Sequence, residues 1–299
     1  MSPRHLALLV LGVVAVAFSA IFIRLTEAPP MTIALYRNAI AAALLLPFAL
    51  ARHREEIRSL TRRQWGLAAM AGVLLAAHFA TWIPSLDFTT VAASTVLVTT
   101  QPLWVATLSY LVFSERLRRG AVIGIAVALA GTAVVSGGDV SLSGRAAFGD
   151  LLAILGAILA AGYFVTGRAL RRRMSLLAYV SICYSVCALV MIPVVAASGQ
   201  PFVGLRAVDW GLLLLMALVP QILGHTVFNY LLGDVEATVV AIAVMGEPVG
   251  ATLLALAFFG ETPPWTAAAG GALILAGVYV AITAQARARR ATLLRRSSN

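Results

Sequence analysis

Long apolar runs separated by short polar connections dominate the chain. A helix needs about 20 residues to cross the hydrocarbon core of a bilayer, and ten runs reach that length. They are residues 6–25, 31–51, 65–84, 90–113, 119–136, 149–168, 176–197, 209–231, 238–259 and 265–284. The pattern predicts an all-α membrane protein with ten transmembrane helices.

The connections between these runs carry helix breakers and are too short to hold a soluble domain. The breakers are Pro29-Pro30, Gly137-Gly138, Gly199-Gln200-Pro201 and Pro263-Pro264. All function must therefore reside in the membrane part. The first run is too long for the core of a signal peptide and has no obvious small-residue cleavage site, so we expect it to be retained as the first helix.

Composition supports a membrane-embedded chain. Of the 299 residues, 61% are hydrophobic and 11% are charged, and the mean hydropathy is +0.94. A soluble domain of this size could not bury so much apolar surface. The net charge of +10 comes from arginines that lie between the apolar runs, so we expect a lipid bilayer and no nucleic acid as partner.

The distribution of arginine predicts the orientation. With the N-terminus inside, 18 arginines fall in inner connections or the C-terminal tail, and three fall outside. Positively charged residues concentrate on the cytoplasmic side of membrane proteins. We therefore expect a multi-pass protein of a bacterial inner (plasma) membrane, with both termini cytoplasmic.

The two halves of the chain resemble each other. At an offset of 146 residues Pro102 meets Pro248 and Glu115 meets Glu261, and at close offsets Arg24 meets Arg168 and His78 meets His225. Five helices per half is an odd number, so the second copy enters the membrane from the opposite side, and the arginine-rich connections exchange accordingly. The expected domains are residues 1–145, the first five-helix repeat; residues 146–286, the second, inverted five-helix repeat; and residues 287–299, a cytoplasmic Arg-rich tail.

The ordered motifs resemble the drug/metabolite transporter superfamily and its EamA-type branch over nearly the whole chain. They are Gln101-Pro102 with Glu115-Arg116-Leu117, Glu247-Pro248 with Glu261-Thr262, Gly149-Asp150-Leu151, and an arginine in the second helix, Arg37. The resemblance implies ten helices in two halves and a transport function. The aromatic amino acid exporters are the nearest group in likeness. Thr262 departs from the family, which often has an arginine there.

Two charged residues lie inside predicted membrane helices, where a charge is costly unless it faces a cavity or a partner. Arg37 could attract a substrate carboxylate, and Glu247 could attract an amine or carry a proton. Alternatively, the two could form a buried ion pair that holds the halves together. Both interpretations stay open at this point.

Other residues in the apolar runs could serve transport or packing alike. Pro102 and Pro248 break backbone hydrogen bonds at matching positions, which favours kinks and gating beside a binding site. His78 and His225 are, with Glu247, proton-coupling candidates. Glu115 and Glu261 could cap helices or act as gates. The expected substrate-binding residues are Arg37, His78, Trp82, Gln101, Trp104, Tyr163 and Glu247.

The sequence favours a secondary transporter, most plausibly an exporter of amino acids or similar small amphipathic metabolites that works by alternating access. A nucleotide-binding loop, a metal-ligand cluster and a catalytic motif are absent from the sequence, so we expect no cofactor and no enzyme. The alternatives are a membrane-embedded enzyme acting on lipid-linked substrates, or a channel. Glycines spaced for close helix approach leave a homo-oligomer open.

Overall fold

The computed structural model describes residues 2–89, 94, 97–135, 144–260, 262 and 265–297. Every regular element in these ranges is a helix. The helices are α1 (Pro3–Leu25), α2 (Pro30–Arg52), α3 (Arg54–Ser59), α4 (Arg62–Phe88), α6 (Gln101–Phe113), α7 (Arg119–Val135), α8 (Gly144–Arg171), α9 (Leu176–Ser198), α10 (Ala207–Met216), the π-helix η1 (Ala217–Thr226), α11 (Val227–Leu231), α12 (Ala237–Val244), α13 (Glu247–Phe259) and α14 (Trp265–Ser297). Gly137-Gly138, Pro263-Pro264 and Glu261 lie outside the described residues.

Eight helical segments in the described ranges are long and apolar enough to cross a membrane, and the chain is a multi-pass membrane protein. The two remaining predicted spans correspond to the shorter helices α6 and α7. Part of each predicted span, residues 90–93 and 95–96 of the first and residue 136 of the second, lies outside the described residues. The count of ten crossings therefore stays a prediction.

One short helix was missed by the sequence analysis, which treated residues 52–64 as a connection. Helix α3 has Glu55 and Glu56 in its first turn and Arg58 in its last, an arrangement that favours a helix through its dipole. Next in the chain, the Thr61 side chain accepts from the Gln64 backbone N–H and Gln64 accepts from the Thr61 N–H, a capping box that starts α4.

Two membrane segments are interrupted midway. Helix α12 ends at Val244, a turn follows at Met245 and Gly246, and α13 then begins at Glu247 with Pro248 in its first turn. Helix α6 likewise begins with a proline, Pro102, in its first turn. Proline lacks a backbone donor and is tolerated best at a helix start, so both prolines lie where a new helix begins rather than within a continuous one.

A third irregularity lies in the eighth predicted span, residues 209–231. It was predicted as one helix, and it contains the π-helical segment η1, with Pro220 inside it. The proline removes one backbone donor, which favours a local change of hydrogen-bond register. Short π segments within α-helices are frequent at functional sites.

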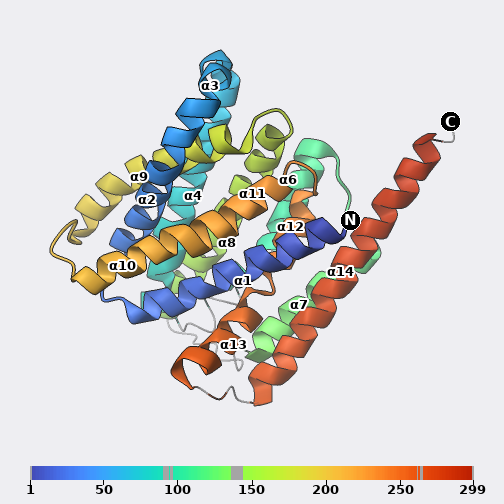
Figure 1. The fold of residues 1–299 in the computed structure, drawn as a ribbon. Coiled ribbons are helices and arrows are strands. Elements are labelled where there is room, and N and C mark those ends of the chain that lie inside the picture. Colours follow the sequence, from blue (N-terminus) through green and yellow to red (C-terminus); the bar gives the residue numbers. More distant parts are fainter. Residues whose placement is uncertain are drawn as a thin grey trace.

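Helices α7 and α14 pack side by side and antiparallel (Figure 1). A Cβ atom added at Gly124 would lie 2.5 Å from the Gly277 oxygen, and one added at Gly131 would lie 2.6 Å from the Gly270 oxygen. The two backbones are therefore in direct contact at two levels, which only glycine allows.

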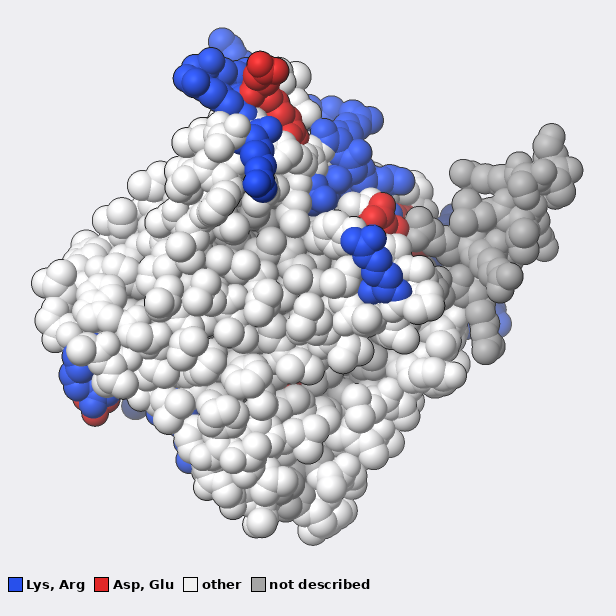
Figure 2. Space-filling model, in the orientation of Figure 1, with Lys and Arg blue, Asp and Glu red and all other residues white. Residues whose placement is uncertain are grey.

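The connections at each end of the helical bundle are joined by hydrogen bonds, and the two ends form two faces of the molecule. On the Arg-rich face, defined by α3, the end of α8 and the start of α9, Glu56 accepts a hydrogen bond of 2.6 Å from the Ser175 backbone N–H. On the opposite face, Asp209 accepts hydrogen bonds from Thr26 and Arg206. Figure 2 shows basic side chains gathered at the end that carries α3, above a broad belt almost free of charge. The belt matches the region expected to contact lipid.

The first prediction concerns the α7–α14 contact. Gly124→Ala should lower the free energy of unfolding by about 1–3 kcal/mol, since the added methyl group meets backbone atoms that cannot move independently. Gly66→Ala is the matched control, because a Cβ there has open space and alanine favours a helix by up to about 1 kcal/mol. Thermal unfolding in detergent measures both. Equal effects would contradict the close contact.

The second prediction concerns pH. Burial disfavours the Glu56 carboxylate, but hydrogen bonds from Ser175 and the charge of His53 outweigh this and lower its pKa below 4.5. A lowered folded-state pKa contributes stability above the unfolded pKa and loses it as pH falls through the folded value. Wild type should therefore melt above Glu56→Gln at neutral pH, and the difference should vanish in acid. Glu55→Gln, the control, should show no such pH dependence.

Candidate functional site

Arg37 on α2 lies in the interior of the bundle, only 3% exposed. Its Nε donates a hydrogen bond of 3.0 Å to Gln221 Oε1 on η1. Its guanidinium carbon lies 4.7 Å from the centroid of the Phe79 ring, a cation–π contact. Its Nη2 has no hydrogen-bond partner among the described residues. The charge is thus held by neutral groups and keeps donors for an anionic ligand.

Glu247 begins α13 and is half-buried. The charge of Glu247 acts on Arg37 through the interior, but no ion pair within 4.0 Å joins them in the described part of the chain. The direct Arg37–Glu247 pair considered from the sequence is therefore not formed in this structure.

His78 on α4 is anchored on both sides. Its ring stacks on Trp82 at 5.8 Å between centroids and 4° between planes. Its Nδ1 lies 2.9 Å from the carbonyl oxygen of Gly156 on α8. A carbonyl can only accept, so Nδ1 carries a proton, and in the neutral ring Nε2 remains an acceptor.

His225 on η1 faces the same interior. Its ring lies 6.2 Å from Phe79 and 6.3 Å from Tyr163, measured between centroids. Its Nδ1 is buried and has no hydrogen-bond partner in the described ranges. Phe79 contacts both Arg37 and His225, each of which has a buried nitrogen without a hydrogen-bond partner among the described residues.

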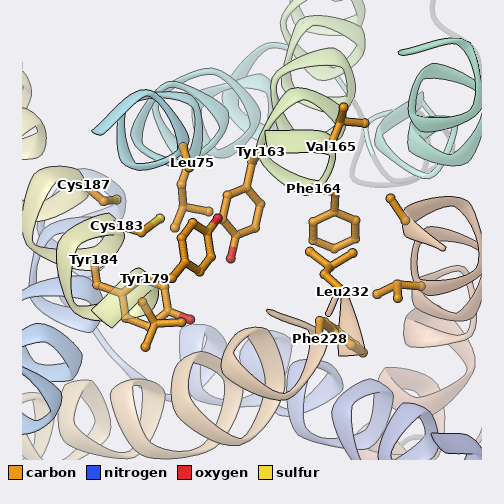
Figure 3. Packing of buried hydrophobic residues seen from close by; sticks show 14 of the residues in the cluster. Leu75, Tyr163, Phe164, Val165, Tyr179, Cys183, Tyr184, Cys187, Phe228 and Leu232 are labelled. Carbon is orange, nitrogen blue, oxygen red and sulfur yellow. The ribbon is translucent and has the colours of Figure 1, made fainter. Parts of the chain in front are cut away.

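A network of hydroxyl and amide groups extends the cluster. Asn229 Nδ2 donates to the Tyr163 hydroxyl at 2.6 Å and lies 3.4 Å from the Tyr184 hydroxyl. Tyr184 in turn shares a hydrogen bond of 3.0 Å with Thr226. Figure 3 shows Tyr163 on α8 and Tyr179 and Tyr184 on α9 within one cluster of buried side chains.

The contacts connect some of the residues expected from the sequence but not others. Arg37, His78, Trp82, Tyr163 and His225 are linked through shared aromatic and polar neighbours on α2, α4, α8 and η1.

Helix α6, which carries Gln101, Pro102 and Trp104, packs on α8 and α12. The Trp104 Nε1 donates locally to Thr100 at 3.2 Å. Within the described residues, no hydrogen bond or ring contact joins Gln101 or Trp104 to Arg37 or to either histidine.

Several members of the cluster were not predicted as site residues, namely Phe79, Tyr179, Tyr184, Gln221, Thr226 and Asn229. One signal was available. Gln221, His225 and Asn229 are spaced four apart, which brings polar side chains to one side of a helix. The tyrosines of α9 gave no such signal, since aromatic residues in apolar helices more often serve packing.

An ion pair lies at the Arg-rich face, beside this cluster. Arg168 Nη2 on α8 donates to Glu115 Oε1 at 3.3 Å, and Nη1 donates to the Leu232 carbonyl at 3.0 Å. Burial raises the pKa of Glu115, although Arg168 favours its charged form. We call Glu115 and Arg168 the inner latch. It connects the first half of the chain to the second.

These groups offer a cation, a carboxylate, two imidazoles and several hydroxyls in one interior. Such a set can bind a small zwitterion and can move protons. Among the described residues no cluster of three His, Cys, Asp or Glu side chains could hold a metal ion.

Comparison with known proteins agrees with a membrane carrier. Residues 4–137 and residues 147–283 each match the EamA-like transporter family. Two proteins of Archaeoglobus fulgidus, each named an uncharacterized transporter, are 27% and 25% identical; the alignments cover 95% and 92% of this chain and 99% and 95% of theirs. One solved crystal structure matches with a TM-score of 0.82 at 20% identity, over 96% of this chain and 99% of that chain, which shows a shared fold.

The third prediction tests the Arg37–Gln221 contact. Gln221→Leu should cost about 1–3 kcal/mol in free energy of unfolding, since it leaves a buried charge without its acceptor. In the double variant with Arg37→Met most of this cost should disappear, a coupling of about 0.5–3 kcal/mol. Detergent unfolding of the four proteins measures the cycle. Gln101→Leu replaces Gln221→Leu in the control cycle and should be additive with Arg37→Met; coupling of the same size there would contradict a specific contact.

Proposed function

The chain belongs to the EamA-like transporter family, and we propose that it is a secondary transporter that exports amino acids or similar small amphipathic metabolites by alternating access. That it is a membrane transporter follows from the family and from the named relatives. The substrate class and the mechanism are the proposal.

The single observation that supports the substrate class is the environment of Arg37. A buried guanidinium held by an amide and an aromatic ring, with Nη2 lacking a partner among the described residues, is suited to a carboxylate. Glu247, half-buried and without an ion pair in the described ranges, is suited to an amine or a proton. The stacked rings of His78 and Trp82 add a flat apolar surface. An amino acid presents all three complementary features.

Two glycine contacts between α7 and α14 support a pair of inverted five-helix halves, because the repeat maps each contact onto the other. Under the offset of 146, Gly124 corresponds to Gly270, and Gly131 corresponds to Gly277. The contact between Gly124 and Gly277 thus becomes the contact between Gly270 and Gly131, and both are present. Two antiparallel helices that exchange in this way favour a two-fold axis perpendicular to them, in the plane of the membrane.

The inner latch supports alternating access. Glu115 and Arg168 lie at the Arg-rich face, which we assign to the cytoplasm by the positive-inside rule. Their ion pair joins the two halves where a cytoplasmic entrance would open. The helix starts at Pro102 and Pro248 supply the flexible points about which the inner parts of the bundle can move.

The fourth prediction is the functional test. Purified protein in liposomes should show saturable uptake of a labelled amino acid that is accelerated by unlabelled substrate on the opposite side. Arg37→Gln should reduce uptake of carboxylate-bearing substrates by about tenfold or more, since a charge-assisted hydrogen bond contributes about 1.5–3 kcal/mol. The matched control is Arg54→Gln, an exposed arginine on α3.

The outcomes distinguish the alternatives. A steady conductance without saturation would identify a channel, and conversion of the substrate without flux would identify an enzyme. Intact uptake by Arg37→Gln would exclude carboxylate binding by Arg37. A panel of the twenty amino acids competing with the tracer would then define the substrate.

The fifth prediction concerns coupling. If Glu247 carries the driving proton, Glu247→Gln should abolish stimulation of uptake by a proton gradient while counterflow exchange continues. Glu55→Gln on the surface helix α3 is the control and should retain the stimulation. A Glu247→Gln variant that still responds to the gradient would remove Glu247 from the proton role, leaving His78 and His225 as candidates.

A further inference from the structure

A pocket of about 710 Å³ opens on the Arg-rich face, away from the site described above. It is formed where α4 begins and where α6 and α8 end. Its lining residues are Thr61, Arg63, Gln64, Leu67, Phe113, Ala169, Leu170, Arg172 and Arg173.

The lining combines an arginine rim with an apolar floor. Arg63, Arg172 and Arg173 have no ion pair within 4.0 Å in the part of the chain that the structure describes, although Arg172 acts at longer range on the charge of Glu115. Leu67, a partly buried residue packed on the core, lies below them. Three cations without counter-charges favour an anionic occupant.

The floor is completed by Phe113 and Leu170. Phe113 is packed partly against the core, and Leu170 is almost fully buried. A free phosphate ion would use only the rim. A ligand with an anionic group attached to an apolar body would use the rim and the floor together.

The pocket lies at the depth where the bilayer meets water. Each of the three helices that form it is apolar and changes to polar sequence at this level: α4 starts at Arg62, α6 ends at Phe113, and α8 ends at Arg171. Trp65, one residue after Gln64, is 41% exposed, and tryptophan is enriched at this interface. Figure 2 shows basic side chains gathered in this part of the molecule.

We propose that this pocket binds the headgroup of one anionic phospholipid from the cytoplasmic leaflet. The phosphate accepts hydrogen bonds from the guanidinium groups of Arg63, Arg172 and Arg173, which present paired donors to phosphate oxygens. The glycerol region and the first carbons of an acyl chain lie against Leu67 and Phe113. Such basic pockets between membrane helices are suited to lipid headgroups.

The position gives the lipid access to the inner latch. Phe113 is two residues before Glu115, and Ala169 directly follows Arg168. A bound lipid therefore contacts the ends of the two helices that bring the latch residues together.

The test uses native mass spectrometry of the full-length protein in detergent, titrated with phosphatidylglycerol or with phosphatidylcholine of the same acyl chains. The first phosphatidylglycerol should bind at least about tenfold more tightly than phosphatidylcholine. Removing Arg63, Arg172 and Arg173 together, as glutamines, should weaken that binding by about tenfold or more, since each basic residue near an anionic surface contributes about a fivefold factor.

The matched control removes the same number of charges from the same face but outside the pocket, as Arg52→Gln, Arg54→Gln and Arg58→Gln. It should change the affinity by less than about threefold. Equal losses in the two triple variants would overturn the proposal, because they would reflect net charge alone. So would equal binding of the two lipids.

A second variant tests the proposal independently, in case the triple variant does not fold. Leu67→Trp keeps every charge and fills the apolar floor, and it should also weaken phosphatidylglycerol binding; unchanged affinity would overturn the placement of the lipid. Inorganic phosphate added at millimolar concentration separates the two sources of the anion. Complete displacement of the lipid by phosphate would identify the free ion as ligand and overturn the lipid assignment, and retention of the lipid supports it.

Discussion

The hydrocarbon core of a bilayer supplies no water, so a polar group that enters it needs a partner within the bundle or in a cavity that water or a ligand can reach. This constraint governs the centre of the molecule. Arg37 is held by Gln221 and Phe79, and the hydroxyls of Tyr163 and Tyr184 are linked through Asn229. Such a polar interior is tolerated in a membrane protein where water or a substrate can reach it.

The close glycine contacts recur in both halves of the chain, whereas the charged residues of the candidate site do not. Glycine contacts repeat in both halves: Gly12 lies against Phe228, and the corresponding Gly156 lies against Trp82. The charges of Arg37 and Glu247 do not repeat. At an offset of 146 the counterpart of Glu247 is Gln101, and at offsets of 144 to 147 the counterparts of Arg37 are the uncharged residues 181–184. Two halves that each match the family model thus hold an asymmetric set of polar groups at the candidate site.

Much of the site could be predicted from isolated polar residues in apolar runs. Arg37, His78, His225 and Tyr163 do meet in the interior. Other features were not predicted, for physical reasons. Tyr179, Tyr184 and Phe79 are aromatic residues in apolar helices, where such residues usually serve packing. Six residues, Arg54–Ser59, are too few for a helical periodicity to be read. The π segment depends on hydrogen-bond register, which composition does not reveal.

The sequence by itself determined that the chain lies in a membrane, that its two halves are related and that it belongs to a transporter family. The membrane environment follows from the number of apolar residues transferred into lipid, and the related halves and the family follow from motifs that recur along the chain. Only the tertiary structure decided which polar groups are partners. Arg37 binds Gln221 rather than Glu247, and three helix ends enclose a basic pocket. Partners depend on the rotation and depth of each helix, which are set by close packing between segments far apart in the sequence.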